Sequence, residues 1–173
     1  MAINRLNHAV LYVRDADRSA TFYEEVLGFR RLPGVELRGA VFLRAEGSTN
    51  DHDLGLFSVG HAAVESPAGR GAVGMYHLAW EVDTLADLER LSKRLADAGA
   101  LVGATNHGTT RAVYGEDPDG LQFELTWIIP AALLTADDTP GTMRRLDVAS
   151  DIARFGADTL GGVGISRPAP TPA

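Results

Sequence analysis

The sequence predicts an α+β protein of two tandem βαβββ modules, whose mixed sheets form a half-barrel cleft around a metal site. Three observations carry this prediction. The same order of strand-like and helix-like segments occurs twice, and His8 and His77 stand early in the first strand of each copy, 69 residues apart (77 − 8). A carboxylate, Glu124, interrupts an apolar strand near the end of the second copy. Two half sheets with one apolar face each would pair to bury that face, so the first strands would line a cleft.

The first copy begins with a strand over residues 6–13 that is largely apolar on both faces. This pattern predicts a strand covered on both sides, with His8 partly buried. Asp15 is expected to cap a helix whose apolar residues recur at helical spacing, and Gly28 to end it. Three short strands are expected to follow, at residues 29–32, 36–44 and 53–59.

The second copy follows a connection over residues 61–74 that is rich in Gly, Ala, Ser and Pro. Its first strand is expected at residues 75–82 and contains His77. Thr84 and Asp87 have the spacing of a capping box, and the helix behind them has an apolar stripe made of Leu85, Leu88, Leu91, Leu95 and Ala98. Strands are expected at 101–105, 111–116 and 121–129, the last two joined by the turn residues 117–120 into a hairpin.

We therefore expect one domain over residues 1–130, with module one at 3–60 and module two at 74–129. Residues 131–173 form a C-terminal stretch of different composition. Within it, residues 131–142 are loop-like and the apolar spacing at 143–155 predicts a short docked helix. The stretch from residue 156 is rich in Gly and Pro, which predicts a flexible tail.

Composition restricts the class of partner and of chemistry. The chain has 173 residues, of which 45% are hydrophobic, and a net charge of −7 without basic clusters. This argues against nucleic acid or an anionic membrane as the main partner. Without cysteine, a metal site must use His and carboxylate ligands. Because no signal peptide and no membrane-spanning run is present, we expect a cytoplasmic protein.

The three residues that carry the fold prediction also suggest a chemistry. Glu124 in an apolar strand needs a cation or hydrogen bonds if buried, although it could instead face solvent on a half-exposed strand. His8 and His77 could likewise be two unrelated core histidines. If the cleft forms, the three side chains could make the 2-His-1-carboxylate arrangement of non-haem Fe(II) oxygen chemistry, which leaves an open face on the metal.

Three motifs in order resemble the vicinal oxygen chelate (glyoxalase/bleomycin resistance/dioxygenase) superfamily. They are Leu-Asn-His-Ala-Val-Leu-Tyr-Val at residues 6–13, Met-Tyr-His-Leu-Ala-Trp-Glu-Val at 75–82, and Asp-Pro-Asp-Gly-Leu-Gln-Phe-Glu-Leu at 117–125. The resemblance covers residues 3–129 and is greatest to the single-domain type I extradiol (catechol 2,3-dioxygenase-like) enzymes.

The resemblance implies that His8, His77 and Glu124 hold Fe(II), with Mn(II) as an alternative. It implies that His52, in the segment Asn-Asp-His-Asp-Leu, is an acid/base residue, whereas without it His52 would be a polar residue at a loop end. It implies that Tyr114 hydrogen-bonds a substrate oxygen.

By the same resemblance His107 is a further histidine of the pocket. Without it Tyr114 would be a packed strand aromatic, and a one-residue slip of the hairpin would point it away from Glu124.

The implied reaction is the cleavage of a small catechol-like diol by Fe(II) and O2. Glyoxalase-like members generally add a fourth ligand from the last strand of the first module, where this chain has Gly55; Asp53 could still supply a carboxylate. Two alternatives stay open. One is a metal-dependent glyoxalase, isomerase, epimerase or thiol transferase, and the other is a non-catalytic protein that binds an aromatic drug. A homo-oligomer is compatible with either.

Overall fold

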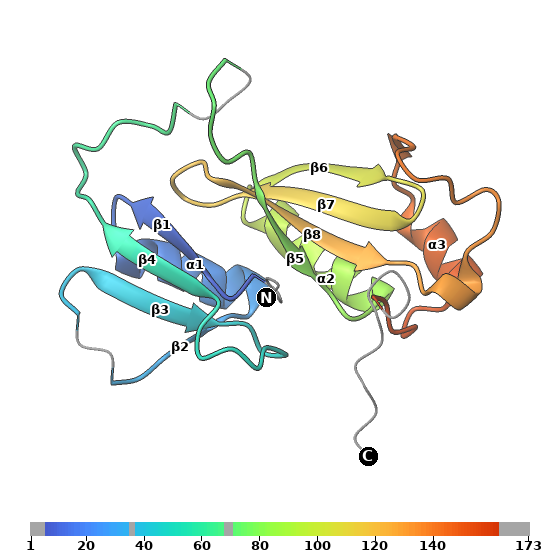
Figure 1. Ribbon diagram of the computed structural model, residues 1–173, viewed down its shortest axis with the longest axis horizontal. Helices are drawn as coiled ribbons and strands as arrows, with labels where there is room; N and C mark the ends of the chain where they lie inside the picture. Colours follow the sequence, from blue (N-terminus) through green and yellow to red (C-terminus); the bar gives the residue numbers. More distant parts are fainter. Residues whose placement is uncertain (1–5, 35–36, 68–70, 163–173) are drawn as a thin grey trace, which may run out of the picture. The chain divides into compact units, whose positions relative to one another are not determined.

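The computed structural model describes residues 6–34, 37–67 and 71–162, and the chain divides into two compact units (Figure 1). Unit one comprises Met1–Gly74 and Asp117–Leu121, and unit two comprises Met75–Glu116 and Gln122–Ala173. Residues 3–5 and 35–36 of the predicted first module, 68–70 of the predicted connection and 163–173 of the predicted tail lie outside the described residues.

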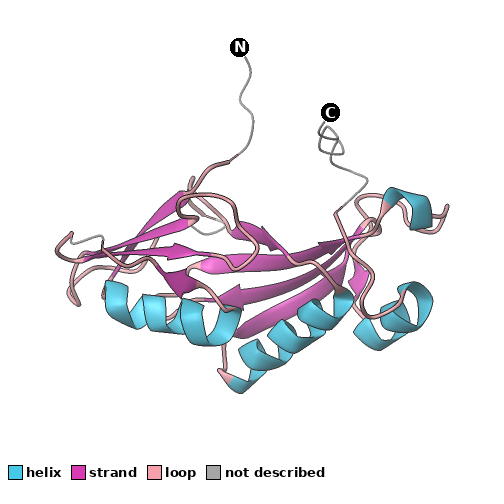
Figure 2. Cartoon of the chain, turned by 90° about the horizontal axis from the view of Figure 1, so that it is seen from below, coloured by secondary structure: helices cyan, strands magenta, loops and turns pink. Residues whose placement is uncertain are grey.

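Unit one has the predicted order of elements, which are β1 (Ala9–Val13), α1 (Ala16–Leu27), β2 (Arg30–Arg31), β3 (Ala40–Arg44) and β4 (Leu54–Ser58). The sheet order is β1-β4-β3-β2, with β1 and β4 parallel. Helix α1 lies against one face of this sheet (Figure 2).

Local signals set the ends of α1 as predicted. The Asp15 carboxylate accepts hydrogen bonds from the backbone N–H groups of Asp17 and Arg18 at 2.9 and 3.0 Å, which satisfies donors that the first turn leaves open. Gly28 ends the helix in the left-handed conformation, with φ of 79°. The buried side chains of Ala16, Ala20 and Tyr23 then face the sheet.

The second face of β1 is exposed, which corrects the expectation of a strand covered on both sides. Leu11 and Val13 are buried, whereas Val10 is 52% and Tyr12 is 76% exposed. His8 is exposed as well, not partly buried, and its Nδ1 lies 2.7 Å from Asn7 Oδ1. The physical reason is that within unit one α1 covers only the Leu11 face, and alternate residues of a strand point to opposite faces.

Unit two contains β5 (Leu78–Glu81), α2 (Leu85–Asp97), β6 (Leu101–Asn106), β7 (Thr110–Glu116) and β8 (Gln122–Ile128). Its sheet order is β5-β8-β7-β6-β9, where β9 is the short strand Arg144–Arg145, and β5 and β8 are parallel. Thr84 caps α2 by accepting from the Asp87 N–H at 3.1 Å, and its hydroxyl donates to the Asp87 carboxylate at 2.7 Å. The predicted stripe is confirmed at its four leucines, which are buried, but Ala98 at the end of the helix is exposed.

The C-terminal stretch differs from the prediction. It has a 3-10 helix (Ala131–Leu133), a short strand β9 (Arg144–Arg145) and a helix α3 (Val148–Phe155). Residues 143–147 are therefore not helical: β9 pairs with the edge of β6, and Met143 is 78% exposed. Helix α3 begins only after Asp147, whose side chain accepts from the Ser150 N–H at 3.0 Å.

Within the described ranges, no helix has the length and apolar character that crossing a bilayer requires.

Candidate metal and substrate site

Glu124 lies on the face of β8 that points away from the core of unit two. Its neighbours Phe123 and Leu125 are buried on the opposite face. The Glu124 side chain is nevertheless only 15% exposed, because other polar groups surround it. It is therefore neither a core residue nor an ordinary solvent-facing one.

His77 is the first of these groups. It immediately precedes β5, in which Ala79 lies opposite Glu124, so His77 and Glu124 share a face of the sheet. His77 Nε2 lies 3.1 Å from Glu124 Oε2. Nδ1 of the same ring is buried without a hydrogen-bond partner among the described residues, which is unusual for a structural histidine.

The His77–Glu124 pair fits a divalent metal ion. An imidazole nitrogen and a carboxylate oxygen each bind such ions at about 2.0–2.2 Å, so two ligand atoms at right angles around one ion lie about 3 Å apart. The separation of 3.1 Å matches this value. The donor set of nitrogen and oxygen suits Fe(II), Mn(II) and Zn(II) alike.

Tyr114 is placed beside Glu124 by the pairing of β7 and β8, in which these two residues are directly opposite. The hairpin register is thus the one in which both side chains share a face. Burial, and then the charge of Glu124, raises the pKa of Tyr114 from 10.0 to about 12. The phenol therefore keeps its proton at neutral pH and is a hydrogen-bond donor.

His107 lies in the turn between β6 and β7 and reaches the same hydroxyl. Its Nε2 is 2.8 Å from the Tyr114 oxygen, and its backbone N–H donates to the Thr110 carbonyl at 3.0 Å. Four of the six predicted site residues, His77, His107, Tyr114 and Glu124, therefore form one connected polar group in unit two.

The other two predicted residues, His8 and His52, lie together in unit one. Their ring centroids are 4.3 Å apart, and the His52 ring also contacts the edge of Phe42. His52 Nδ1 lies 3.2 Å from Asp51 Oδ2. A hydrogen bond from the backbone N–H of His52 is the main cause that lowers the pKa of Asp51. This carboxylate therefore stays ionised beside the imidazole.

Position 55 offers no ligand, and Asp53 is engaged elsewhere. Gly55 pairs with Val10 of β1, and a Cβ there would lie 3.4 Å from the Val10 side chain. Asp53 is buried and accepts hydrogen bonds from Ala45 N (2.9 Å), Ser48 Oγ (2.7 Å) and Asn50 Nδ2 (2.7 Å). Its carboxylate holds the loop between β3 and β4 together. The structure therefore gives no support to the alternative prediction that Asp53 is a metal ligand.

Within the described residues, neither unit gathers three His, Asp or Glu side chains that could hold a metal by themselves. The predicted ligands are divided, with His8 in unit one and His77 and Glu124 in unit two.

Arg111 is a residue of this neighbourhood that the sequence analysis missed. It is 1% exposed and donates from Nη1 to the Gly108 carbonyl at 2.7 Å, in the turn that carries His107. The sequence did contain a signal. Arg111 and Val113 are two residues apart in a strand and so share a face, and in the hairpin Arg111 pairs with the buried Trp127, so the arginine is buried as well.

Comparisons with known proteins agree with this fold. The family model "Glyoxalase/Bleomycin resistance protein/Dioxygenase superfamily" matches residues 5–125. Catechol-2,3-dioxygenase of Bacillus subtilis is 30% identical over 120 residues, which are 69% of this chain but only 40% of that protein. A lactoylglutathione lyase of Neisseria meningitidis is 31% identical over 123 residues, which are 69% of this chain and 88% of that protein.

A solved glyoxylase/bleomycin resistance protein/dioxygenase domain from Frankia sp. EAN1pec superposes with a TM-score of 0.56 at 24% identity, over 72% of this chain and 92% of that one. This likeness shows the fold. Together with the family model over residues 5–125, it leads to one conclusion: the chain belongs to the glyoxalase/bleomycin resistance protein/dioxygenase superfamily.

Proposed function

We propose that the protein is a metal-dependent extradiol dioxygenase that opens the ring of a small catechol-like diol with O2. The observation that carries this proposal is the absence of a fourth ligand at position 55 together with the engagement of Asp53 in its loop. A site of two histidines and one carboxylate leaves an open face for a chelating substrate. A similarity to catechol-2,3-dioxygenase of Bacillus subtilis supports the choice.

His8, His77 and Glu124 would hold the metal, with Fe(II) preferred and Mn(II) as the alternative. When bound, the ion supplies positive charge that lowers the pKa of the diol hydroxyls and an electron source for O2. The proposal requires His8 to bind the same ion as the His77–Glu124 pair. That requirement is tested by whether His8→Ala weakens metal binding as much as His77→Ala does.

Tyr114 and His107 would act on the substrate oxygen. The Tyr114 hydroxyl, directly opposite Glu124 in the hairpin, would donate a hydrogen bond to a substrate oxygen that gains negative charge. His107, 2.8 Å from that hydroxyl, orients it. His52, beside His8 and the Asp51 carboxylate, would move the proton, since a neutral imidazole has one nitrogen that donates and one that accepts.

A second candidate is a metal-dependent glyoxalase, isomerase, epimerase or thiol transferase. It is favoured by one observation: the match to a lactoylglutathione lyase covers 88% of that protein, whereas the match to the dioxygenase covers 40%. This candidate predicts activity without O2. A third candidate, a non-catalytic protein that binds an aromatic drug, predicts binding without a metal.

The decisive experiment loads the protein anaerobically with Fe(II), adds a panel of catechols, admits O2, and records oxygen uptake and a coloured ring-opened product. Glu124→Gln is expected to abolish iron binding and oxygen uptake. Its matched control is Glu116→Gln, in the same hairpin, where Glu116 contacts Gln122 at 2.9 Å. Lack of oxygen uptake with every diol would refute the proposal, and anaerobic isomerisation of a thiol adduct would establish the second candidate instead.

A further inference from the structure

The stretch of residues 131–162, here called the C-terminal extension, lies beyond residues 5–125 that the family model matches. We propose that this extension positions His107 against the Tyr114 hydroxyl, and that Arg111 is the positioning residue that connects the two. Its importance for catalysis rests on the proposed function, but the contacts themselves lie entirely within unit two.

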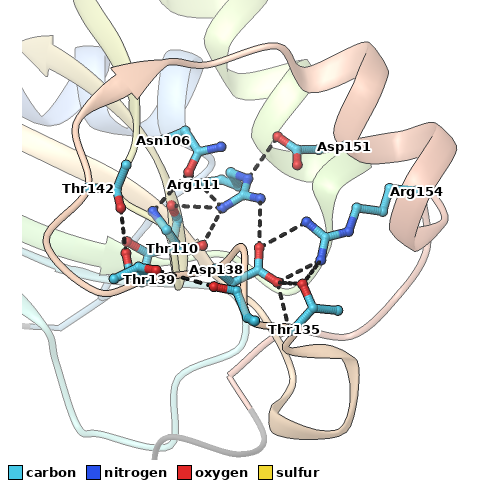
Figure 3. A network of polar contacts seen from close by, with 11 residues as sticks. Asn106, Thr110, Arg111, Thr135, Asp138, Thr139, Thr142, Asp151 and Arg154 are labelled. Carbon is cyan, nitrogen blue, oxygen red and sulfur yellow. Dashed lines mark hydrogen bonds and ion pairs between the residues drawn. The ribbon is translucent and has the colours of Figure 1, made fainter.

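The first step is the burial of Arg111 by carboxylates of the extension (Figure 3). Asp151 of α3 lies 2.8 Å from Arg111 Nε, and Asp138 lies 3.8 Å from Nη2. The side chains of Arg111 and Asp138 are 2% and 3% exposed. A buried guanidinium is tolerated only with such partners, so the extension determines whether Arg111 can stay in place.

The second step is a set of hydrogen bonds that Arg111 donates to the turn between β6 and β7. Its Nη1 donates to the Gly108 carbonyl at 2.7 Å, to Asn106 Oδ1 at 3.0 Å and to the Thr110 carbonyl at 3.3 Å. These three acceptors flank His107 on both sides in the sequence. One guanidinium therefore connects the carboxylates of the extension with the backbone that carries His107.

A second contact joins the extension to the same turn. Gly108 has a φ of +85°, and a Cβ at this position would lie 1.9 Å from the carbonyl oxygen of Thr139. Only a glycine allows the extension to approach this closely. Strand β9 pairs with the end of β6, where Arg144 lies opposite Asn106, so the extension contacts the turn on more than one side.

The consequence concerns His107 more than Tyr114. The position of Tyr114 is determined by its pairing with Glu124 in the regular β7–β8 hairpin, and this pairing does not involve the extension. His107 lies in the turn, so its contact with the Tyr114 oxygen at 2.8 Å depends on the conformation that Arg111 stabilises. Loosening the extension should therefore separate His107 from Tyr114 while leaving the His77–Glu124 pair intact.

The test follows the His107 ring nitrogens by ¹⁵N NMR on the full chain after removal of bound metal with a chelator. Tyr114→Phe gives the reference spectrum for a His107 ring without its hydrogen bond. In Asp151→Asn, the His107 resonances are expected to move most of the way to that reference, whereas the His52 resonances stay at the parent values. Arg154→Gln, which removes a partner of Asp138, should give a smaller shift in the same direction.

Arg90→Gln is the matched control, because Arg90 also pairs with an aspartate, Asp87, on a helix of unit two, and among the described residues no ion pair joins Arg90 to the extension. A folded Asp151→Asn protein with lower stability and unchanged His107 resonances would show a merely structural role and overturn the inference. If Asp151→Asn does not fold, equal spectra for Arg154→Gln and Arg90→Gln overturn it. Since the readout needs no substrate, failure of the dioxygenase proposal is a separate result.

Discussion

Asp138→Asn is expected to destabilise unit two by about 2 kcal/mol at neutral pH. The Asp138 carboxylate accepts hydrogen bonds from Arg154 Nη2 at 2.6 Å and Nη1 at 2.9 Å, and from the Thr135 N–H at 2.9 Å (Figure 3). These contacts, the bond from Arg154 foremost, lower the pKa of Asp138 from 3.8 to about 2. The ionised carboxylate is thus stabilised in the folded state.

The magnitude follows from that pKa. One pKa unit corresponds to about 1.4 kcal/mol, so a fall from 3.8 to about 2 corresponds to about 2.4 kcal/mol. Solvent screening reduces this value, because the Arg154 side chain is 38% exposed. Since the folded-state pKa is the lower one, the contribution is present in full above the unfolded-state pKa of 3.8 and is lost as the pH falls through about 2.

Urea unfolding followed by tryptophan fluorescence measures this difference selectively, because both tryptophans, Trp80 and Trp127, lie in unit two. The deficit of Asp138→Asn should be largest at pH 7 and shrink below about pH 4. Asp137→Asn, at the exposed neighbouring position, is the control; its charge acts on Arg154 only as the last of several causes, so its deficit should be much smaller. Equal stability of Asp138→Asn and the parent at pH 7, or a deficit that does not change with pH, would refute the reasoning.

Three further predictions concern unit one. Gly55→Glu places a carboxylate beside the Val10 side chain; it should tighten divalent metal binding in calorimetry and abolish oxygen uptake, and unchanged affinity would contradict the assigned site. Asp53→Ala removes three hydrogen bonds and should lower the stability of the β3–β4 loop by about 2–3 kcal/mol in hydrogen exchange, with metal affinity retained; a loss of metal binding in a folded protein would make Asp53 a ligand. Asp119→Ala removes the acceptor of the Arg14 backbone N–H at 2.7 Å and should speed exchange of that amide at least tenfold, since about 1.4 kcal/mol is a factor of ten; an unchanged rate would show that the contact is not maintained in solution.

The elements of the fold could be predicted from the sequence because their signals are local. Asp15 and Gly28 lie next to the residues whose backbone groups they satisfy, and the four leucines of α2 recur at the period of a helix. The repeat of strand and helix order then predicted the two sheets. The pairing of Tyr114 with Glu124 needed the structure, because a sequence pattern does not fix the register of a hairpin.

The remaining features depend on partners that are distant in the sequence. Asp138 and Asp151 contact Arg111 from 27 and 40 residues further along the chain (138 − 111 and 151 − 111), and no periodic pattern connects them. The apolar residues at 143–147 suggested helix because of their spacing, but Asp147 offered a stronger start signal. The exposure of His8 reflects which face of β1 the helix covers, which the composition of that strand does not reveal.

The turn at residues 117–121 has a consequence for the order in which the protein can fold. The Asp119 carboxylate accepts hydrogen bonds from the backbone N–H and from the guanidinium Nη1 of Arg14, across 105 residues of sequence. A nascent chain that ends at residue 74 therefore still lacks part of unit one, and the missing turn appears only after most of the second sheet has been synthesised. Closing so long a loop is slow. The first unit should thus reach its final protection from proteases late, and together with the β7–β8 hairpin.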